Sequence, residues 1–144
     1  MRFPLGRQNA AEQQDRIFEA QKNIIQFLAK RQSCIIVGRC ADFIPADLDH
    51  VMNVYICAGY QNRLAHCMND LGLTEAEGRR MIKSVDEARK AYHLNYAGYL
   101  PGDPAHMDII INSGFLGIDG TAEYLAGAVI RKFGLSRTIG EHEC

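Results

Sequence analysis

The sequence predicts an α/β fold, in which a parallel sheet is flanked by helices. Short apolar runs rich in β-branched residues recur along the chain, and amphipathic or capped helical segments separate them. The runs are apolar on both sides, which is typical of strands buried inside a parallel sheet. Strands of this kind that alternate with helices are joined by right-handed crossovers.

Length and composition indicate one soluble domain. The chain has 144 residues, of which 47% are hydrophobic and 23% charged, which is enough to bury a core. A net charge of -1 gives no general basic field, so a nucleic-acid polymer is not an expected partner. The sequence shows neither the roughly 20 apolar residues of a membrane span nor the zones of a signal peptide, and we expect a cytoplasmic protein with no membrane partner.

The cysteines favour buried thiols over disulfides or a zinc site. Their number is odd, no two form a Cys-x-x-Cys pair, and three lie within or beside apolar runs. A reducing compartment suits this usage. The five are Cys34, Cys40, Cys57, Cys67 and Cys144.

The first half of the chain contains an arm, a helix and two predicted strands. Residues 1–9 have no clear period and are expected to be a loop or extended arm that leads into a domain at 10–135. Apolar residues recur at helical spacing from Ala10 to Arg31, which predicts an amphipathic helix. Ser33–Gly38 and Val51–Cys57 are predicted to be buried strands.

The second half contains three helices and a third strand. A helix is expected over Gln61–Gly72, and Thr74-Glu-Ala-Glu77 has the form of a capping box that starts another helix, which runs to about Tyr92. Residues 96–104 are rich in turn residues, and Met107–Asn112 is predicted to be the third buried strand. A helix over Gly117–Phe133 closes the domain, and residues 136–144 are expected to be a flexible tail.

Several segments in this order resemble the cytidylate-kinase-like branch of the nucleoside monophosphate kinases. They begin with Phe18-Glu-Ala-Gln-Lys-Asn-Ile-Ile-Gln-Phe-Leu-Ala29 and Cys34-Ile-Ile-Val-Gly-Arg-Cys-Ala-Asp42. Asn53–Ile56, Ile82-Lys-Ser-Val-Asp-Glu-Ala-Arg89, Gly102-Asp-Pro104 and Ile111-Asn-Ser-Gly114 follow. The resemblance covers about residues 17–133. It implies a P-loop kinase fold and a parent reaction in which ATP donates a phosphoryl group to a nucleoside monophosphate or similar acceptor.

The resemblance places Arg39 on the phosphate of the acceptor. A guanidinium binds phosphate oxygens through two parallel hydrogen bonds, and ligands of open α/β sheets bind at strand ends. The alternative is an arginine paired with a surface carboxylate. Asp42 is implied as a contact to the nucleoside, although the classical cytidylate kinases have an acid directly after the arginine, where this chain has Cys40. Asp42 can instead cap or turn the chain.

The basic helix corresponds to the lid of these kinases. Its cations are Arg79, Arg80, Lys83, Arg89 and Lys90. Phosphoryl transfer depends mainly on positioning and electrostatics, so the resemblance makes Lys83, Asp86 and Arg89 candidate catalytic residues. The alternative is a solvated helix face whose charges are balanced by neighbouring carboxylates.

Two further residues are implied at the substrate. Arg63 corresponds to a second phosphate-region arginine, with a surface residue as its alternative, and Tyr92 continues the family-like string of the lid helix. His66, His93 and His106 have no regular metal-ligand spacing. We expect ordinary surface or loop histidines and no metal site formed by this chain.

The chain has no Gly-x-x-x-x-Gly-Lys-Ser/Thr motif, and no strand and glycine-rich turn precede its first helix. ATP and Mg²⁺ are therefore implied only for a full-length family member, and we expect this chain to be inactive alone. The resemblance implies an incomplete fold that lacks its first strand and P-loop. Whether the chain is an enzyme stays open, with a non-catalytic nucleotide-binding or oligomerising regulatory module and an unrelated small α/β domain as alternatives.

The absent strand would lie between Ser33–Gly38 and Val51–Cys57. Its loss leaves a slot of about twice the 4.8 Å strand spacing, with two unpaired edges. Either these strands pair directly or a second copy fills the slot by exchange, which predicts a homodimer.

Overall fold

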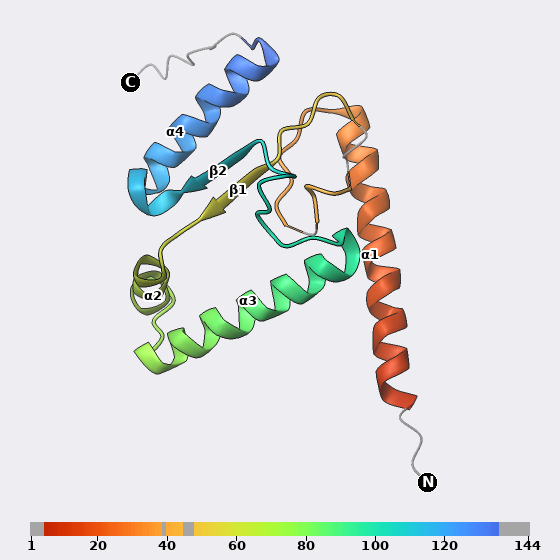
Figure 1. The fold of residues 1–144 in the computed structure, drawn as a ribbon, viewed down its shortest axis with the longest axis vertical. Coiled ribbons are helices and arrows are strands. Elements are labelled where there is room, and N and C mark those ends of the chain that lie inside the picture. The colour runs from red at the N-terminus through yellow and green to blue at the C-terminus, as the bar shows by residue number, and fades with distance from the viewer. Residues whose placement is uncertain (1–4, 39, 45–47, 136–144) are drawn as a thin grey trace, which may run out of the picture.

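A computed structural model describes residues 5–38, 40–44 and 48–135, and within these ranges it has four helices and one parallel pair of strands (Figure 1). In chain order the elements are α1 (Leu5–Arg31), β1 (Val54–Cys57), α2 (Tyr60–Asn69), α3 (Glu75–Ala97), β2 (Ile109–Asn112) and α4 (Ser113–Phe133). The predicted mixed α/β class is confirmed. The tail predicted at 136–144 lies outside the described residues.

The sheet is formed by β1 and β2, which run parallel and in register from Val54 opposite Ile109 to Cys57 opposite Asn112. Two of the three predicted strands, Val51–Cys57 and Met107–Asn112, are present as β1 and β2, but each begins later than expected. Just before the ladder, the Asp108 side chain accepts a hydrogen bond from the Asn53 amide at 2.7 Å, and the Asn53 carbonyl accepts one from the Asp108 amide at 2.9 Å. These contacts fix the register at the amino end of the pair.

The prediction of a strand over Ser33–Gly38 is wrong for this structure. Residues 33–37 form no strand, and in the described part of the chain β1 pairs only with β2. Ile35 and Val37 are 94% and 88% exposed, whereas Ile36 packs against the core. A strand exists only as part of a hydrogen-bonded pair, and no neighbour within the described chain supplies one. Direct pairing with Val51–Cys57 is therefore also absent.

Helix boundaries differ from the prediction at several ends. Leu5–Asn9, expected to be part of an arm, is the first part of α1. The capping box is confirmed, because the Thr74 side chain accepts from the Glu77 amide and the Glu77 carboxylate accepts from the Thr74 amide. Helix α3 continues past Tyr92 to Ala97 and ends at Gly98, whose positive φ of 82° suits a left-handed cap.

Helices α2 and α4 are also shifted. Helix α2 ends at Asn69, before the predicted glycine stop at Gly72. Helix α4 begins at Ser113, where the Asn112 side chain accepts from the Gly114 amide, and Gly117 interrupts its first turns with a φ of 73°. The interruption explains why the regular pattern in the sequence begins only at Gly117.

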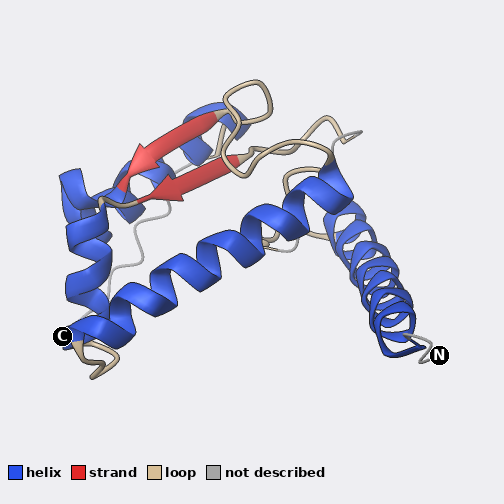
Figure 2. Ribbon diagram, turned by 60° about the horizontal axis from the view of Figure 1, so that its bottom comes forward, coloured by secondary structure: helices blue, strands red, loops and turns tan. Residues whose placement is uncertain are grey.

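The core consists of two small clusters. Phe18, Ile25, Cys40 and Ile44 pack with Tyr92 and Tyr96 where α1 meets the end of α3, and Leu64, Cys67 and Ile82 pack between α2 and α3. Helix α3 runs past the strand pair from α2 to α1, and α1 projects away from the rest of the molecule (Figure 2). Within the described ranges no large side chain is less than 2% exposed, so the core is thin.

Candidate functional site

One face of α3 carries two groups of charged and polar side chains. Asp86, Arg89 and His93 follow each other at spacings of three and four residues, which places them on one side of the helix. Asp86 and His93 are two turns apart, or about 10 Å along the axis. The first group gathers around Asp86 beside α2, and the second around His93 at the carboxyl end of the helix.

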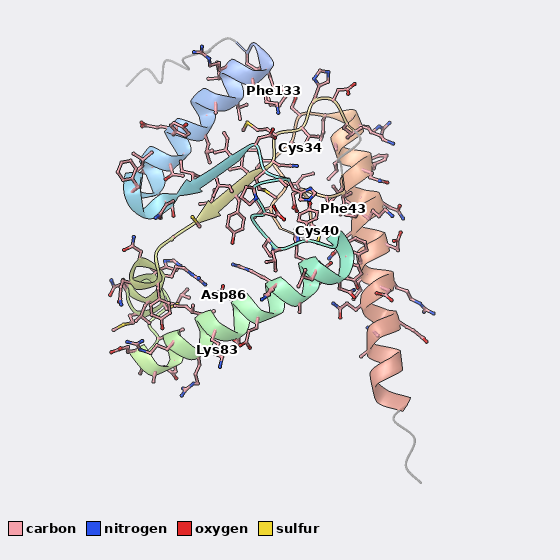
Figure 3. The ribbon with its side chains drawn as sticks, viewed as in Figure 1. Cys34, Cys40, Phe43, Lys83, Asp86 and Phe133 are labelled. Atoms are coloured by element: carbon pink, nitrogen blue, oxygen red, sulfur yellow. The ribbon has the colours of Figure 1, made fainter. Side chains whose placement is uncertain are left out.

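The first group is built on an arginine fork. Arg63, on the helix that follows β1, donates from both terminal nitrogens to the Asp86 carboxylate at 2.9 and 2.6 Å. The two side chains are 32% and 47% exposed, so solvent reaches the pair. Figure 3 labels Asp86 and Lys83 on α3. The arrangement has the two parallel N–H···O bonds with which arginine also binds phosphate.

Electrostatics in this group favour the charged forms. The hydrogen bond from Arg63 holds the pKa of Asp86 below its usual value, with the charges of Arg63 and Arg89 acting in the same direction against partial burial. The same bond raises the pKa of Arg63. Arg89 thus acts on Asp86 through its charge while its own guanidinium makes no hydrogen bond or ion pair with the described residues.

The second group is centred on Asp42. Its carboxylate faces His93 Nε2 at 3.1 and 2.9 Å, and the Tyr99 hydroxyl donates to Oδ2 at 2.9 Å. The Asp42 carbonyl accepts from the Asn53 side chain at 3.1 Å. These contacts tie the turn at Cys40–Ile44 to the end of α3 and to the residue before β1. Figure 3 labels two residues of this turn, Cys40 and Phe43.

Burial shapes the chemistry of this second group. Burial, the hydrogen bond to Asp42 and the charge of Asp42 together raise the pKa of Tyr99, so its hydroxyl stays a donor. Burial first, and the Asp42 charge second, raise the pKa of Cys40 to about 11. Cys40 is therefore a neutral thiol at physiological pH, and it is not an activated nucleophile.

The sequence-predicted site residues are only partly brought together. Arg63, Asp86 and Arg89 cluster beside α2, while Asp42 lies at the amino end of the strands, next to Asn53. Tyr92 packs edge-on against Phe18 and donates to Gln21, so it lies in the interface with α1. Lys83 is exposed. Arg39 lies outside the described residues.

His93 and Tyr99 are the site residues that sequence reasoning missed. His93 was expected to be an ordinary surface or loop histidine, but it is buried, with 8% of the residue exposed. A signal for this burial exists, because His93 lies three full helical turns after Ile82, which is also buried. The expectation for His66 holds, since it pairs with Asp70 at the surface.

An apolar hollow of about 510 Å³ lies elsewhere, against β2 and the start of α4. It is lined by Ile109, Ile110, Ile111, Asn112, Phe115, Leu116 and Tyr124. Phe115 is 85% exposed, which makes this an open apolar surface. No charged side chain lines it.

Two features are absent from residues 5–38, 40–44 and 48–135. No three histidine, cysteine, aspartate or glutamate side chains there are grouped so that they would hold a metal ion. No helix of those ranges has the length and hydropathy that crossing a membrane requires.

The parallel strands and their helical connections place this chain among the α/β proteins. The model of the cytidylate kinase-like family matches residues 3–114, and the chain belongs to that family. The structure is also similar to the crystal structure of an uncharacterized protein from Eubacterium ventriosum ATCC 27560, with 27% identity and a TM-score of 0.74. That match covers 80% of this chain and 65% of the other. The comparison with curated proteins found no match.

Proposed function

We propose that this chain contributes the acceptor-phosphate part of a nucleotide kinase-like protein and that Arg63 and Arg89 bind the phosphate. The observation that carries the proposal is the two-bond contact of Arg63 with Asp86, next to an Arg89 without a hydrogen-bonded partner among the described residues. A fork that fits a carboxylate also fits a phosphate oxygen pair. Membership in the cytidylate kinase-like family supports a nucleoside monophosphate as the ligand.

In this proposal the Asp86 carboxylate accepts the Arg63 hydrogen bonds that the phosphate of the ligand would otherwise accept. That carboxylate occupies the Arg63 fork in the unliganded chain, and a phosphate dianion brings more negative charge to the same donors. In the parent reaction ATP would donate the phosphoryl group and Mg²⁺ would neutralise part of its charge. Lys83 and Arg89 would stabilise the remaining charge, and Asp86 would orient the arginines. The donor-phosphate cradle has no counterpart in this sequence, so we expect no phosphoryl transfer by this chain alone.

Calorimetric titration tests the binding. CMP, ATP and inorganic phosphate are titrated in the presence of Mg²⁺ into the wild-type chain and into Arg63→Ala, Arg89→Ala and Arg39→Ala. The matched control is Arg79→Ala, because Arg79 lies on the same helix and pairs with Glu75 four residues away. We expect CMP binding that falls at least tenfold in Arg63→Ala and Arg89→Ala and is unchanged in Arg79→Ala.

Two results would count against the proposal. CMP binding that is equally strong in all the variants would place the ligand elsewhere, and no binding of any ligand would remove the acceptor site from this chain. A separate assay of ADP formation tests the expectation that this chain alone transfers no phosphoryl group. Turnover of ATP by the purified chain would contradict it.

A specific observation favours a second function, assembly into a homodimer. Residues 33–37 form no strand, Ile35 and Val37 are almost fully exposed, and the edge of β1 away from β2 is open within the described chain. One copy therefore offers both a free strand edge and a segment rich in β-branched residues. In two copies related by a two-fold axis, residues 33–37 of each copy can pair with the open β1 edge of the other. A second copy is therefore the partner that we propose for this edge.

Light scattering after size exclusion tests the homodimer. We expect a dimer mass for the wild-type chain and a monomer mass for Val37→Lys, because a charge on the pairing segment blocks edge-to-edge association. Ile118→Lys is the matched control, since Ile118 is 80% exposed on α4 and is not part of either edge. A wild-type monomer, or dissociation by both variants alike, would refute pairing through this segment.

A further inference from the structure

Both ring nitrogens of His93 face hydrogen-bond acceptors, whereas a neutral imidazole carries a hydrogen on only one of them. Nδ1 lies 2.8 Å from the Tyr99 carbonyl oxygen, which only accepts hydrogen bonds, so Nδ1 carries a hydrogen. Nε2 faces both carboxylate oxygens of Asp42, which are acceptors as well. A bare nitrogen beside a carboxylate is repelled. The contact therefore holds one more proton than a neutral imidazole next to an ionised carboxylate possesses.

The contact between His93 and Asp42 is largely shielded from solvent. The side chains of His93 and Asp42 are only 10% and 17% exposed. Tyr99 covers the pair, with its ring edge-on to the imidazole at 4.8 Å and its hydroxyl bonded to Asp42. A buried polar atom without a partner is destabilising, so loss of the proton forces the pair to separate.

Separation of His93 and Asp42 would release the turn that contains Asp42. Within this turn the Ala41 amide donates a hydrogen bond to the Gly38 carbonyl, and the amides of Phe43 and Ile44 donate to the Cys40 carbonyl. Cys40 and Ile44 pack in the core cluster with Phe18. We propose that His93 and Asp42 form a proton-dependent latch that holds the Cys40–Ile44 turn against the carboxyl end of α3.

Other ionisable groups surround the latch and belong to its titration. Cys40 comes from the turn itself, and Tyr99, Asp103 and His106 come from the loop after α3, with the His106 ring stacked on Tyr99 at 3.6 Å. From α1, Asp15 accepts from Tyr96, three residues further along α3 than His93. The proposal goes beyond the nucleotide site, because the latch acts without any ligand.

Nuclear magnetic resonance tests the latch on the whole chain. The ring nitrogens of His93 and the amides of Cys40–Ile44 are followed between about pH 5 and 9, the range in which histidine ordinarily titrates. We expect the ring to carry both protons while the turn is closed, and the turn amides to shift with the same midpoint as the ring. His66→Gln is the matched control, because His66 and Asp70 form a similar pair that is exposed.

Two variants separate the latch from a purely structural role. His93→Gln keeps a donor toward Asp42 but does not titrate, so the pH-dependent shifts of the turn amides disappear. His93→Phe keeps a ring without a donor, and hydrogen exchange of the Phe43 and Ile44 amides becomes about tenfold faster or more at low pH, because bonds to charged groups contribute at least that factor.

The outcomes decide the proposal even if His93→Phe does not fold, because His93→Gln then supplies the readout alone. Turn amides that do not change with pH in the wild type would overturn the latch. So would pH-dependent shifts that persist unchanged in His93→Gln, since they would belong to another group such as His106.

Discussion

The attachment of α1 depends on one aromatic side chain, which makes Phe18→Ala the most informative test of the fold. Phe18 is 6% exposed, and its ring stacks on Tyr96 with centroids 3.9 Å apart and an angle of 10° between the planes. It also meets Tyr92 edge-on at 6.3 Å. Both tyrosines lie on α3, so the ring joins the two longest helices.

The expected loss follows from burial and ring contacts. Truncating a buried phenylalanine to alanine lowers the free energy of unfolding by about 3–5 kcal/mol, including about 0.5–1.5 kcal/mol for each well-placed aromatic pair. Because the surrounding core is thin and can relax, we expect the lower end, about 3 kcal/mol. With a urea dependence of about 2 kcal/mol per molar, the unfolding midpoint falls by about 1.5 M.

Phe27→Ala is the matched control on the same helix. Phe27 is 55% exposed, and its main contact is the Arg31 guanidinium 4.7 Å from the ring centre, which contributes about 0.5–1 kcal/mol. Urea unfolding followed by circular dichroism, at one protein concentration for all variants, measures both losses. Equal losses for Phe18→Ala and Phe27→Ala would refute the assigned packing face of α1. Phe18→Leu, with an intermediate loss, keeps the comparison open if the alanine variant does not fold.

Gly102→Ala is expected to destabilise the chain by more than Gly98→Ala: both glycines have positive φ, but only at Gly102 would an added Cβ lie 2.6 Å from the Tyr55 ring. Thermal unfolding measures the difference, and equal losses would show that the Tyr55 ring moves aside. Cys40 is expected to react with a disulfide reagent far more slowly than the exposed Cys34 at pH 8, because its pKa is raised to about 11. The native chain holds the Cys40 proton more tightly than the unfolded chain, whose thiol has a pKa of about 9, so this group lowers stability as pH rises from about 9 to about 11. Asp42→Asn should narrow the pH range over which ionisation of Cys40 lowers stability. An unchanged pH dependence of stability in this variant would contradict the influence of the Asp42 charge on Cys40.

The sequence correctly predicted parts of the fold that depend on contacts between residues close together in the chain. The capping box at Thr74 needs only residues three positions apart, and it is present as expected. The runs that became β1 and β2 pair with each other and so keep their predicted state. The helix end at Ala97 was missed although its signal is local, because Gly98 forms the left-handed cap directly after it.

The failed strand over Ser33–Gly38 shows the limit of propensity. Ile35, Ile36 and Val37 favour an extended backbone, but no hydrogen-bonding neighbour is available in the described chain, so the segment forms no strand. His93 was missed for a related reason. Its burial follows from the helical phase it shares with Ile82, whereas its partner Asp42 lies far away in the sequence.

The candidate site is similarly divided between local and distant information. The spacing of Asp86, Arg89 and His93 on one helix face is present in the sequence, but the fork between Arg63 and Asp86 requires α2 to lie beside α3. Both members of this pair are about a third or more exposed, so the pair contributes only about 0–1 kcal/mol to stability. Arg63→Ala should therefore leave the fold intact. A loss of nucleotide binding in that variant then reports on the arginine itself, since the helices that present it stay in place.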